Sequence, residues 1–238
     1  MSPTAPPSRR DRQRAATVEE IKETALRLMR DSATTEVRFA DIAREMGMTA
    51  PALYRYFPER DALLTALIVD AWTDLADTLD RAGEDADADH LYAGLSAVAA
   101  AYRAWALRDV PRFTLAFGLP IPGYVMPETA GTAETGRRSR AALERLIQLA
   151  IASGQARLPA TGEVDQRLQA PLDHLGQLAN PPLSPVAYQG LLQAWISVHG
   201  FVTLEAYGHL EDLTEPGRDA LFDSQVRLAM RAMGLCER

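Results

Sequence analysis

The sequence predicts an all-helical protein, with a three-helix head of the helix-turn-helix type followed by a larger helical body. Apolar residues recur at intervals of three and four along most of the chain, which is the spacing of one face of a helix. Runs that alternate apolar with polar residues, as half-buried strands do, are absent. Two short helical patterns meet at Gly47, and a long pattern without internal glycine or proline runs from Glu59 up to Gly83.

Composition limits the class of the protein and its location. A chain of 238 residues with 47% hydrophobic residues can bury a substantial core. The single cysteine, Cys236, excludes an internal disulfide and a cysteine-based zinc site. No stretch approaches the ~20 apolar residues of a membrane span, and the first residues lack the apolar core of a signal peptide. We therefore expect a cytoplasmic protein that does not associate with membranes.

Charge is distributed unevenly along the chain. The net charge is -7, but residues 1–60 hold eleven Lys and Arg against nine Asp and Glu. Residues 1–16 are rich in proline and arginine, and we expect them to form a disordered basic arm. The arm is either a solubilising tail or a source of phosphate and minor-groove contacts. Its arginines are Arg9, Arg10, Arg12 and Arg14.

The first helix of the head is predicted from a capping motif. Thr17 and Glu20 have the spacing of a capping box, so order should begin at Thr17 and the helix should end near Asp31. The N-terminus of this helix, with Thr17, would then be able to meet a phosphate. The head is expected to extend over residues 17–58.

Residues 39–57 contain two helices joined by a sharp turn. Gly47 can take the positive φ that such a turn requires, and Thr49 is a good N-cap for a second helix that starts at Ala50 or Pro51. The first of the two helices should bury one face, made by Phe39, Ile42, Ala43 and Met46.

The turn alone does not decide the function, because two amphipathic helices joined at a glycine occur in many helical domains. The end of the second helix is more informative, since exposed tyrosine hydroxyls serve a core poorly but bind phosphate oxygens well. The whole motif resembles that of the tetracycline-repressor (TetR) family of transcription regulators. The matching residues are Ile42-Ala43, Gly47, Leu53-Tyr54-Arg55-Tyr56-Phe57, and Arg60 before Ala62-Leu63.

The resemblance implies a set of DNA contacts. Arg55 would face a base, because arginine suits a guanine edge, while the tyrosines and Arg60 would hold phosphates, with Lys22 as a further candidate. Arg38 stands where the family commonly has Ser or Thr, and it either reaches a phosphate or is simply solvated. The implied DNA-binding residues are Thr17, Arg38, Thr49, Ala50, Pro51, Ala52, Tyr54, Arg55, Tyr56 and Arg60.

The body is expected over residues 59–238, for effector binding and dimerisation. A leucine-rich stripe over residues 63–79 predicts a long rigid helix, which in the family links the head to the body. Further helices are predicted at residues 90–108, 111–118, 137–153, 163–178, 186–210 and 217–234.

Large aromatic residues gather beside a loop in the body. Residues 119–127 contain three prolines and a glycine, so they cannot form regular structure. The nearby aromatic residues form either a plain core or the wall of an apolar ligand cavity. The candidate ligand-binding residues are Trp72, Tyr102, Trp105, Phe113, Phe117, Tyr124, Met126, Trp195 and His199.

The helix at residues 186–210 is apolar on two faces, so it must be covered on both. One face can pack on the body, and the small residues Gly190, Ala194 and Ser197 on the other would let a partner helix approach closely. Residues 195–200 also resemble the WHG-type C-terminal domain of one TetR subgroup. The resemblance implies that the last two helices of each subunit form the seam of a homodimer.

Catalysis and metal binding have little support. His199 lies on a helix that must be buried, where a core histidine bonded to a neighbour is a more common state than a base or a metal ligand. The four histidines form no HxxxH or HxxE pair, and no nucleophile elbow, phosphate loop or paired-carboxylate motif is present. We therefore expect neither an enzyme nor a cofactor.

The resemblance implies a homodimer that binds a palindromic operator in double-stranded DNA. A small, mostly apolar effector in the body would release a repressor from that operator. The alternative is a DNA-binding dimer that needs no ligand or is controlled by a protein partner, as an activator or a global regulator.

Overall fold

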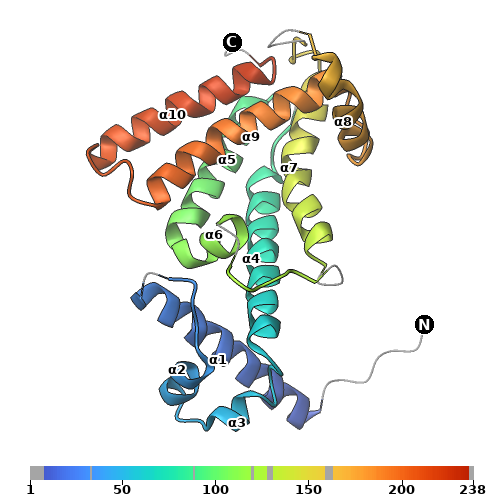
Figure 1. The fold of residues 1–238 in the computed structure, drawn as a ribbon. Coiled ribbons are helices and arrows are strands. Elements are labelled where there is room, and N and C mark those ends of the chain that lie inside the picture. The colour runs from blue at the N-terminus through green and yellow to red at the C-terminus, as the bar shows by residue number, and fades with distance from the viewer. Residues whose placement is uncertain are drawn as a thin grey trace, which may run out of the picture. The chain divides into compact units, whose positions relative to one another are not determined.

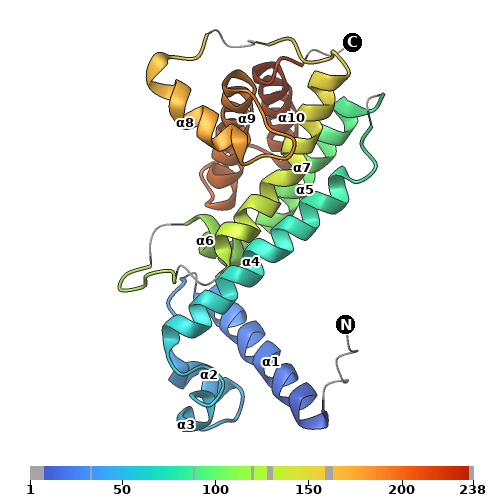
Figure 2. The ribbon, with the colours of Figure 1, turned by 90° about the vertical axis from the view of Figure 1, so that its right-hand side faces the viewer.

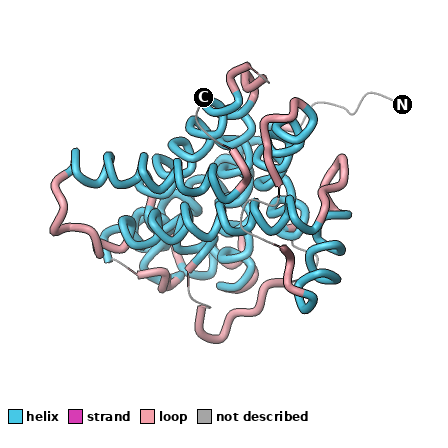
Figure 3. Tube along the Cα trace, turned by 90° about the horizontal axis from the view of Figure 1, so that it is seen from above, coloured by secondary structure: helices cyan, strands magenta, loops and turns pink. Residues whose placement is uncertain are grey.

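The computed structural model describes residues 8–32, 34–87, 89–118, 121–127, 131–158 and 163–235. Over these residues the chain forms ten helices and no strand, so the all-α prediction is confirmed (Figures 1 and 3). Contacts divide the chain into two compact units. The head unit holds residues 1–71 and 109–132, and the body unit holds residues 72–108 and 133–238.

The head unit contains three helices that precede the long fourth one. These are α1 (Arg9–Ser32), α2 (Phe39–Glu45) and α3 (Ala50–Leu53), followed by the first half of α4 (Arg60–Gly83). The short helix α6 (Val110–Phe117) also belongs to this unit and packs against α1. The most deeply buried core residues of the unit are apolar and at most 2% exposed, and they include Ile21, Ala25, Met29, Ile42, Leu53, Leu63, Leu64 and Leu67.

Helix α1 begins at Arg9, so the prediction that order starts at Thr17 is wrong. The capping pair is instead Ser8 and Asp11: the Asp11 amide donates to Ser8 Oγ at 3.2 Å, and the Ser8 amide donates to Asp11 Oδ2 at 3.2 Å. The intervening arginine, glutamine and alanine residues are good helix formers, which carries the helix through the expected arm. Residues 1–7 of that arm lie outside the described residues.

The body unit is built from the second half of α4 and five more helices. These are α5 (Leu91–Arg108), α7 (Thr132–Ala152), α8 (Gln166–Gln177), α9 (Pro185–Ala206) and α10 (Glu215–Ala232). Helix α9 packs against α10, α8 and α5 (Figure 2). The last two helices have side-chain caps, since Ser184 accepts from the Ala187 amide and Thr214 accepts from the Gly217 amide. The observed bounds show that each helix predicted beyond residue 59 is present, with its ends shifted by a few residues.

The small residues of α9 serve the packing of the chain on itself. A Cβ on Gly190 would lie 2.7 Å from the Ala232 carbonyl oxygen, so only glycine allows α10 to approach this closely. Ala194 is 3% exposed, and Ser197 is hydrogen-bonded to Gln225 of α10. The prediction that this face meets a partner subunit is therefore wrong, because the chain's own α10 already covers it.

None of the described helices combines the length and the hydropathy that crossing a membrane requires.

Candidate nucleic-acid interface

The turn between α2 and α3 has the geometry that the sequence predicts. Helix α2 ends at Glu45 with Met46 as its C-cap, and Gly47 then takes a φ of 63°, in the left-handed region. The Met48 amide donates to the Ala43 carbonyl at 2.8 Å, which closes the turn. Thr49 follows in an extended conformation as the N-cap of α3, so the predicted boundary of the second helix is confirmed.

One face of this pair is buried in the head unit. Leu53 is 0% exposed and Phe57 is 7% exposed. The rings of Phe39 and Tyr54 lie 5.0 Å apart and tilted, while Tyr54 remains 53% exposed. Tyr54 is therefore held against the core by its ring and still presents surface to the solvent.

The opposite face carries the residues that the resemblance assigns to DNA. Thr49, Pro51 and Arg55 are exposed, while Ala50, Ala52 and Tyr56 are half-buried. The Thr49 side chain makes no capping hydrogen bond with α3. A short helix with exposed arginine and hydroxyl groups can offer hydrogen bonds to base edges and phosphates.

A hollow of 360 Å³ lies beside this face, and we call it the arginine hollow. Arg38, Tyr54 and Arg60 line it, so three of the predicted DNA contacts come together although they come from separate parts of the head sequence. Arg38 is exposed at the start of α2 and makes no side-chain capping bond there. Two guanidinium groups and a phenol around one hollow suit a phosphate group. The remaining lining residues are Glu36, Val37, Phe39 and Pro122.

Two other predicted phosphate contacts are placed differently. Thr17 lies inside α1, where its hydroxyl donates to the Gln13 carbonyl at 3.0 Å, so it cannot act through a helix N-terminus. Lys22 is buried, and its Nζ lies 2.6 Å from both Asp70 and Glu19. The proposals for these two residues are therefore wrong in the form predicted, because the head unit itself uses their polar atoms.

One contact near α3 could not be predicted from the sequence. Arg14 of α1 donates to the Arg55 carbonyl at 3.1 Å, and its guanidinium lies 5.2 Å from the centroid of the Tyr56 ring. The basic character of residues 9–14 signalled an interaction, but 41 residues separate the two partners and no local pattern joins them.

The candidate ligand-binding residues form groups in both units. In the body unit, the Tyr102 hydroxyl lies 2.6 Å from Nδ1 of His199, and the Trp195 ring stacks on the His199 ring at 5.1 Å. Trp105 stacks on Tyr102 at 6.4 Å. We call these four residues the aromatic cluster. Trp72 is half-buried in the same unit.

Burial sets the protonation of the aromatic cluster. It lowers the pKa of His199, so the imidazole is neutral at neutral pH. It raises the pKa of Tyr102 well above the ordinary value, so the hydroxyl keeps its proton. The Tyr102 hydroxyl can therefore donate to an unprotonated Nδ1, as expected for a core histidine bonded to a neighbour. Among the described residues, no group of three His, Cys, Asp or Glu is placed to hold a metal ion.

The other candidates belong to the head unit. The rings of Phe113 and Phe117 lie 5.6 Å apart on α6. The Tyr124 hydroxyl lies 2.9 Å from Thr65 Oγ1 and 3.2 Å from the Met126 sulfur. Tyr124 is therefore bonded to the first half of α4 and contacts Met126, which the sequence alone could not indicate.

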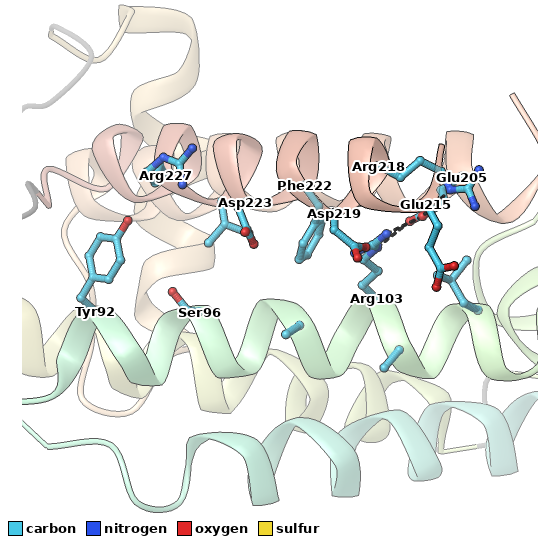
Figure 4. A pocket seen from close by; sticks show the side chains of 14 residues that line it. Tyr92, Ser96, Arg103, Glu205, Glu215, Arg218, Asp219, Phe222, Asp223 and Arg227 are labelled. Atoms are coloured by element: carbon cyan, nitrogen blue, oxygen red, sulfur yellow. Dashed lines mark hydrogen bonds and ion pairs between the residues drawn. The ribbon is translucent and has the colours of Figure 1, made fainter. Parts of the chain in front are cut away.

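A groove of 750 Å³ runs between α5 and α10 of the body unit (Figure 4). Its apolar lining includes Ala100 and Ala104 of α5 and Phe222 of α10. Arg103 binds both carboxylate oxygens of Glu205, donates to Asp219 at 2.8 Å and lies 4.8 Å from the Phe222 ring centroid. The sequence showed neither the groove nor this ion pair, because both depend on three helices meeting.

Two parts of the chain match described protein families. Residues 15–67 match the bacterial regulatory proteins of the tetR family, and residues 95–229 match the Tetracyclin repressor-like C-terminal domain. The HTH-type transcriptional regulator Rv1816 of Mycobacterium tuberculosis is 36% identical over 218 residues, which cover 90% of each chain. The regulator Mb1846 of Mycobacterium bovis has the same identity and coverage.

Solved structures have the same fold. SCO4313, described as a regulatory protein, has a TM-score of 0.74 at 33% identity, over 94% of this chain and 99% of that chain. PfmR of Thermus thermophilus, a TetR family transcriptional regulator, has a TM-score of 0.61 at 17% identity, over 92% and 99% of the two chains. The helix-turn-helix geometry, the two family matches and the relatives together show that the chain belongs to the TetR family of DNA-binding transcription regulators.

Proposed function

We propose that this regulator is a homodimeric repressor that binds a palindromic operator and releases it when a small, mostly apolar effector binds the body unit. The observation that carries the DNA part is the arginine hollow, where Arg38, Tyr54 and Arg60 converge beside the exposed face of α3. A repressor of chromosomal genes would work in the cytoplasm.

The DNA contacts follow from exposure and chemistry. Arg55 is exposed at the end of α3 and can donate two hydrogen bonds to a guanine edge. Thr49 and the three residues of the arginine hollow would hold the phosphates on either side. Ala50, Pro51 and Ala52 are short, so they would let the backbone of α3 come close to the bases. Tyr56 would touch the backbone of the same half-site.

Two copies of the chain would pair through the outer surfaces of α9 and α10. These helices are antiparallel, since Gly190 lies against Ala232 and the Phe201 ring lies 5.3 Å from the Phe222 ring. Large apolar side chains remain exposed on both helices: Ile196 66%, Leu204 47%, Leu221 43% and Leu228 54%. A second copy would remove them from water, and a two-fold dimer would place two heads on half-sites about one DNA turn apart.

The aromatic cluster is the proposed effector site. Tyr102 and Trp105 are 2% exposed, so an effector that reaches them would have to enter the core of the body unit. There the rings of Tyr102, Trp105 and Trp195 would contact it, and the Tyr102–His199 pair would offer a hydrogen-bonding group. This combination favours an aromatic or apolar compound with one polar group. Trp72, in the same unit, remains a further candidate for this effector. Phe113, Phe117, Tyr124 and Met126 of the head unit remain candidates for ligand binding on their own. The WHG-type subgroup, proposed from residues 195–200, centres on the same Trp195 and His199.

Helix α4 offers the route from effector to DNA, because it contributes to both units. Asp74 on its body half accepts from Trp105 Nε1 at 2.9 Å and from Arg108 at 2.6 Å. An effector that displaces Trp105 would therefore disturb the attachment of α4. Linkage requires that DNA weakens effector binding by the same factor.

The full-length protein provides the test. Selection from a random DNA pool should yield an inverted repeat, and the selected duplex can then be titrated by fluorescence anisotropy. Compounds that raise the melting temperature should be added to the complex. Release of the duplex by such a compound supports an effector-controlled repressor. Sequence-specific binding that no stabilising compound reverses would favour the alternative of a ligand-independent or partner-controlled regulator.

A further inference from the structure

Arg14 joins α1 to the end of α3 through its side chain. It comes from the part of α1 that precedes the expected helix start. Its Nη2 donates to the Arg55 carbonyl at 3.1 Å, and its guanidinium carbon lies 5.2 Å from the centroid of the Tyr56 ring. A single side chain thus holds the backbone of one proposed DNA contact and the ring of the next.

The segment that Arg14 holds is short. Helix α3 spans only Ala50–Leu53, and residues 54–56 continue it as a turn. The Tyr56 and Phe57 amides both donate to the Leu53 carbonyl, at 2.9 and 3.1 Å. The backbone direction at Arg55 therefore depends on a tight last turn, to which Arg14 adds a tie from a different helix.

The chemistry of arginine suits this place. A planar guanidinium can donate in its plane to a carbonyl while its face lies on an aromatic ring, whereas a lysine ammonium is a compact point charge. Helix α1 is anchored in the head core through Ile21, Ala25 and Met29, each 0% exposed. Arg14 thus connects the end of α3 to a helix that is deeply buried in the head unit.

We infer that Arg14 is a positioning residue for operator reading: it fixes the directions of Arg55 and Tyr56, and thereby the base preference of α3. The inference rests on the proposed function, in which Arg55 reads a base. It differs from the expectation that the N-terminal arginines act as a basic arm, because Arg14 would act through protein contacts and not through a phosphate.

The test compares variants of the full-length protein on the operator selected with the wild type. Affinities are measured for that operator, for versions with one base pair changed, and for unrelated DNA, each over a range of salt concentrations. The variants are Arg14→Ala, Arg14→Lys, Arg55→Ala and the double variant. Arg10→Ala is the matched control, since Arg10 is an exposed arginine of the same helix.

We expect Arg14→Ala to lower the discrimination at the base pair read by Arg55 by about fivefold or more. This loss is a part of the base discrimination that one bidentate contact supplies. Affinity for unrelated DNA and the salt slope should not change. Arg14→Lys should lose discrimination as well, since the charge alone cannot bridge carbonyl and ring. Adding Arg14→Ala to Arg55→Ala should cost nothing more at that base pair. Arg10→Ala should keep the wild-type discrimination.

Other outcomes overturn the inference. An equal loss for all duplexes with a salt slope reduced by about one per half-site would make Arg14 a phosphate contact, which Arg14→Lys would largely preserve. If both Arg14 variants keep the wild-type discrimination, Arg14 has no role in base reading. Failure of the proposed function is seen separately. The wild type would then show no sequence preference, or Arg55→Ala would leave the preference unchanged. In either case the inference about Arg14 is also wrong.

Discussion

Arg103 of α5 donates to both carboxylate oxygens of Glu205 on α9, from Nε at 2.6 Å and from Nη2 at 2.6 Å. The two side chains are 15% and 6% exposed. Arg103→Met should therefore leave a buried carboxylate with only Arg218, at 3.5 Å, and destabilise the protein by about 3 kcal/mol. Urea unfolding at one fixed protein concentration measures the loss.

The double variant Arg103→Met with Glu205→Leu is the control for this ion pair. It removes both charges, and apolar pairs of similar volume often restore stability at such places. A double variant as unstable as Arg103→Met would show that shape, and not the unpaired charge, causes the loss.

Gly190 and Gly200 form a matched pair on α9. A Cβ on Gly190 would lie 2.7 Å from a carbonyl oxygen of α10, while a Cβ on Gly200 would meet nothing within 4 Å in the subunit. Gly190→Ala should cost about 1–3 kcal/mol by overpacking, whereas Gly200→Ala should stabilise the helix by up to about 1 kcal/mol. Thermal unfolding measures the change in stability of each variant. A destabilising Gly200→Ala would indicate that a partner subunit approaches α9 at that position.

The dimer proposal predicts a contrast between two kinds of variant in α9 and α10. Ile196→Glu and Leu228→Glu should give folded monomers, because these side chains are exposed in the subunit and would lie at the seam. Ala194→Arg should give an unfolded or insoluble chain, since Ala194 is 3% exposed beneath α10. Sedimentation velocity reports the mass. The control Leu178→Glu changes another exposed leucine and should remain a dimer. If Ile196→Glu and Leu228→Glu are both dimers as well, the proposed seam is wrong.

Stability should fall as the pH drops through the range where free histidine titrates. Burial lowers the pKa of His199 in the folded state, so the unfolded chain binds the proton more readily. The contribution is fully present above about pH 6.5, the unfolded value, and is lost as the pH falls toward the lower folded pKa. His199→Gln should flatten this part of the curve of unfolding free energy against pH. His174→Gln, on the exposed side of α8, is the control for replacing a histidine.

Arg60 of the arginine hollow and Arg55 beside α3 predict two distinguishable DNA phenotypes. Arg60→Ala should weaken binding to all duplexes alike and reduce the salt slope by about one per half-site, because it removes a phosphate contact. Arg55→Ala should instead relax the preference at one base pair, at a cost of about 1–3 kcal/mol per half-site. Salt-dependent binding to the selected operator and to single-base variants separates them. A salt slope left unchanged by Arg60→Ala would remove Arg60 from the backbone contacts.

The helix-turn-helix could be predicted because its determinants lie within a few residues of one another. Gly47 supplies the turn, and the apolar spacing on either side sets the two buried faces. The start of α1 was missed because Ser8 stands in a segment whose prolines and arginines suggested disorder. The true start is marked by the capping pair of Ser8 and Asp11, which lies upstream of Thr17 and Glu20 in the same sequence.

Contacts between distant residues account for the remaining errors. Lys22 was a reasonable phosphate ligand by charge, but its partner Asp70 lies 48 residues away. The small residues of α9 correctly indicated a close helix approach, yet a sequence pattern does not say whether the second helix belongs to the same chain. The exposed leucines and isoleucine on the outer surface of α9 and α10 could be identified only once that packing was known.

Tyr102 and Arg103 are neighbours on α5, and they face different parts of the body unit. Tyr102 bonds His199 in the aromatic cluster, and Arg103 ties the same helix to α9 and α10, whose outer surfaces form the proposed seam. A shift of α5 in one subunit would therefore be passed to the other. Occupancy of the first site would then alter the affinity of the second. If it raises that affinity, operator release follows a sigmoidal curve, steeper than that of two independent sites.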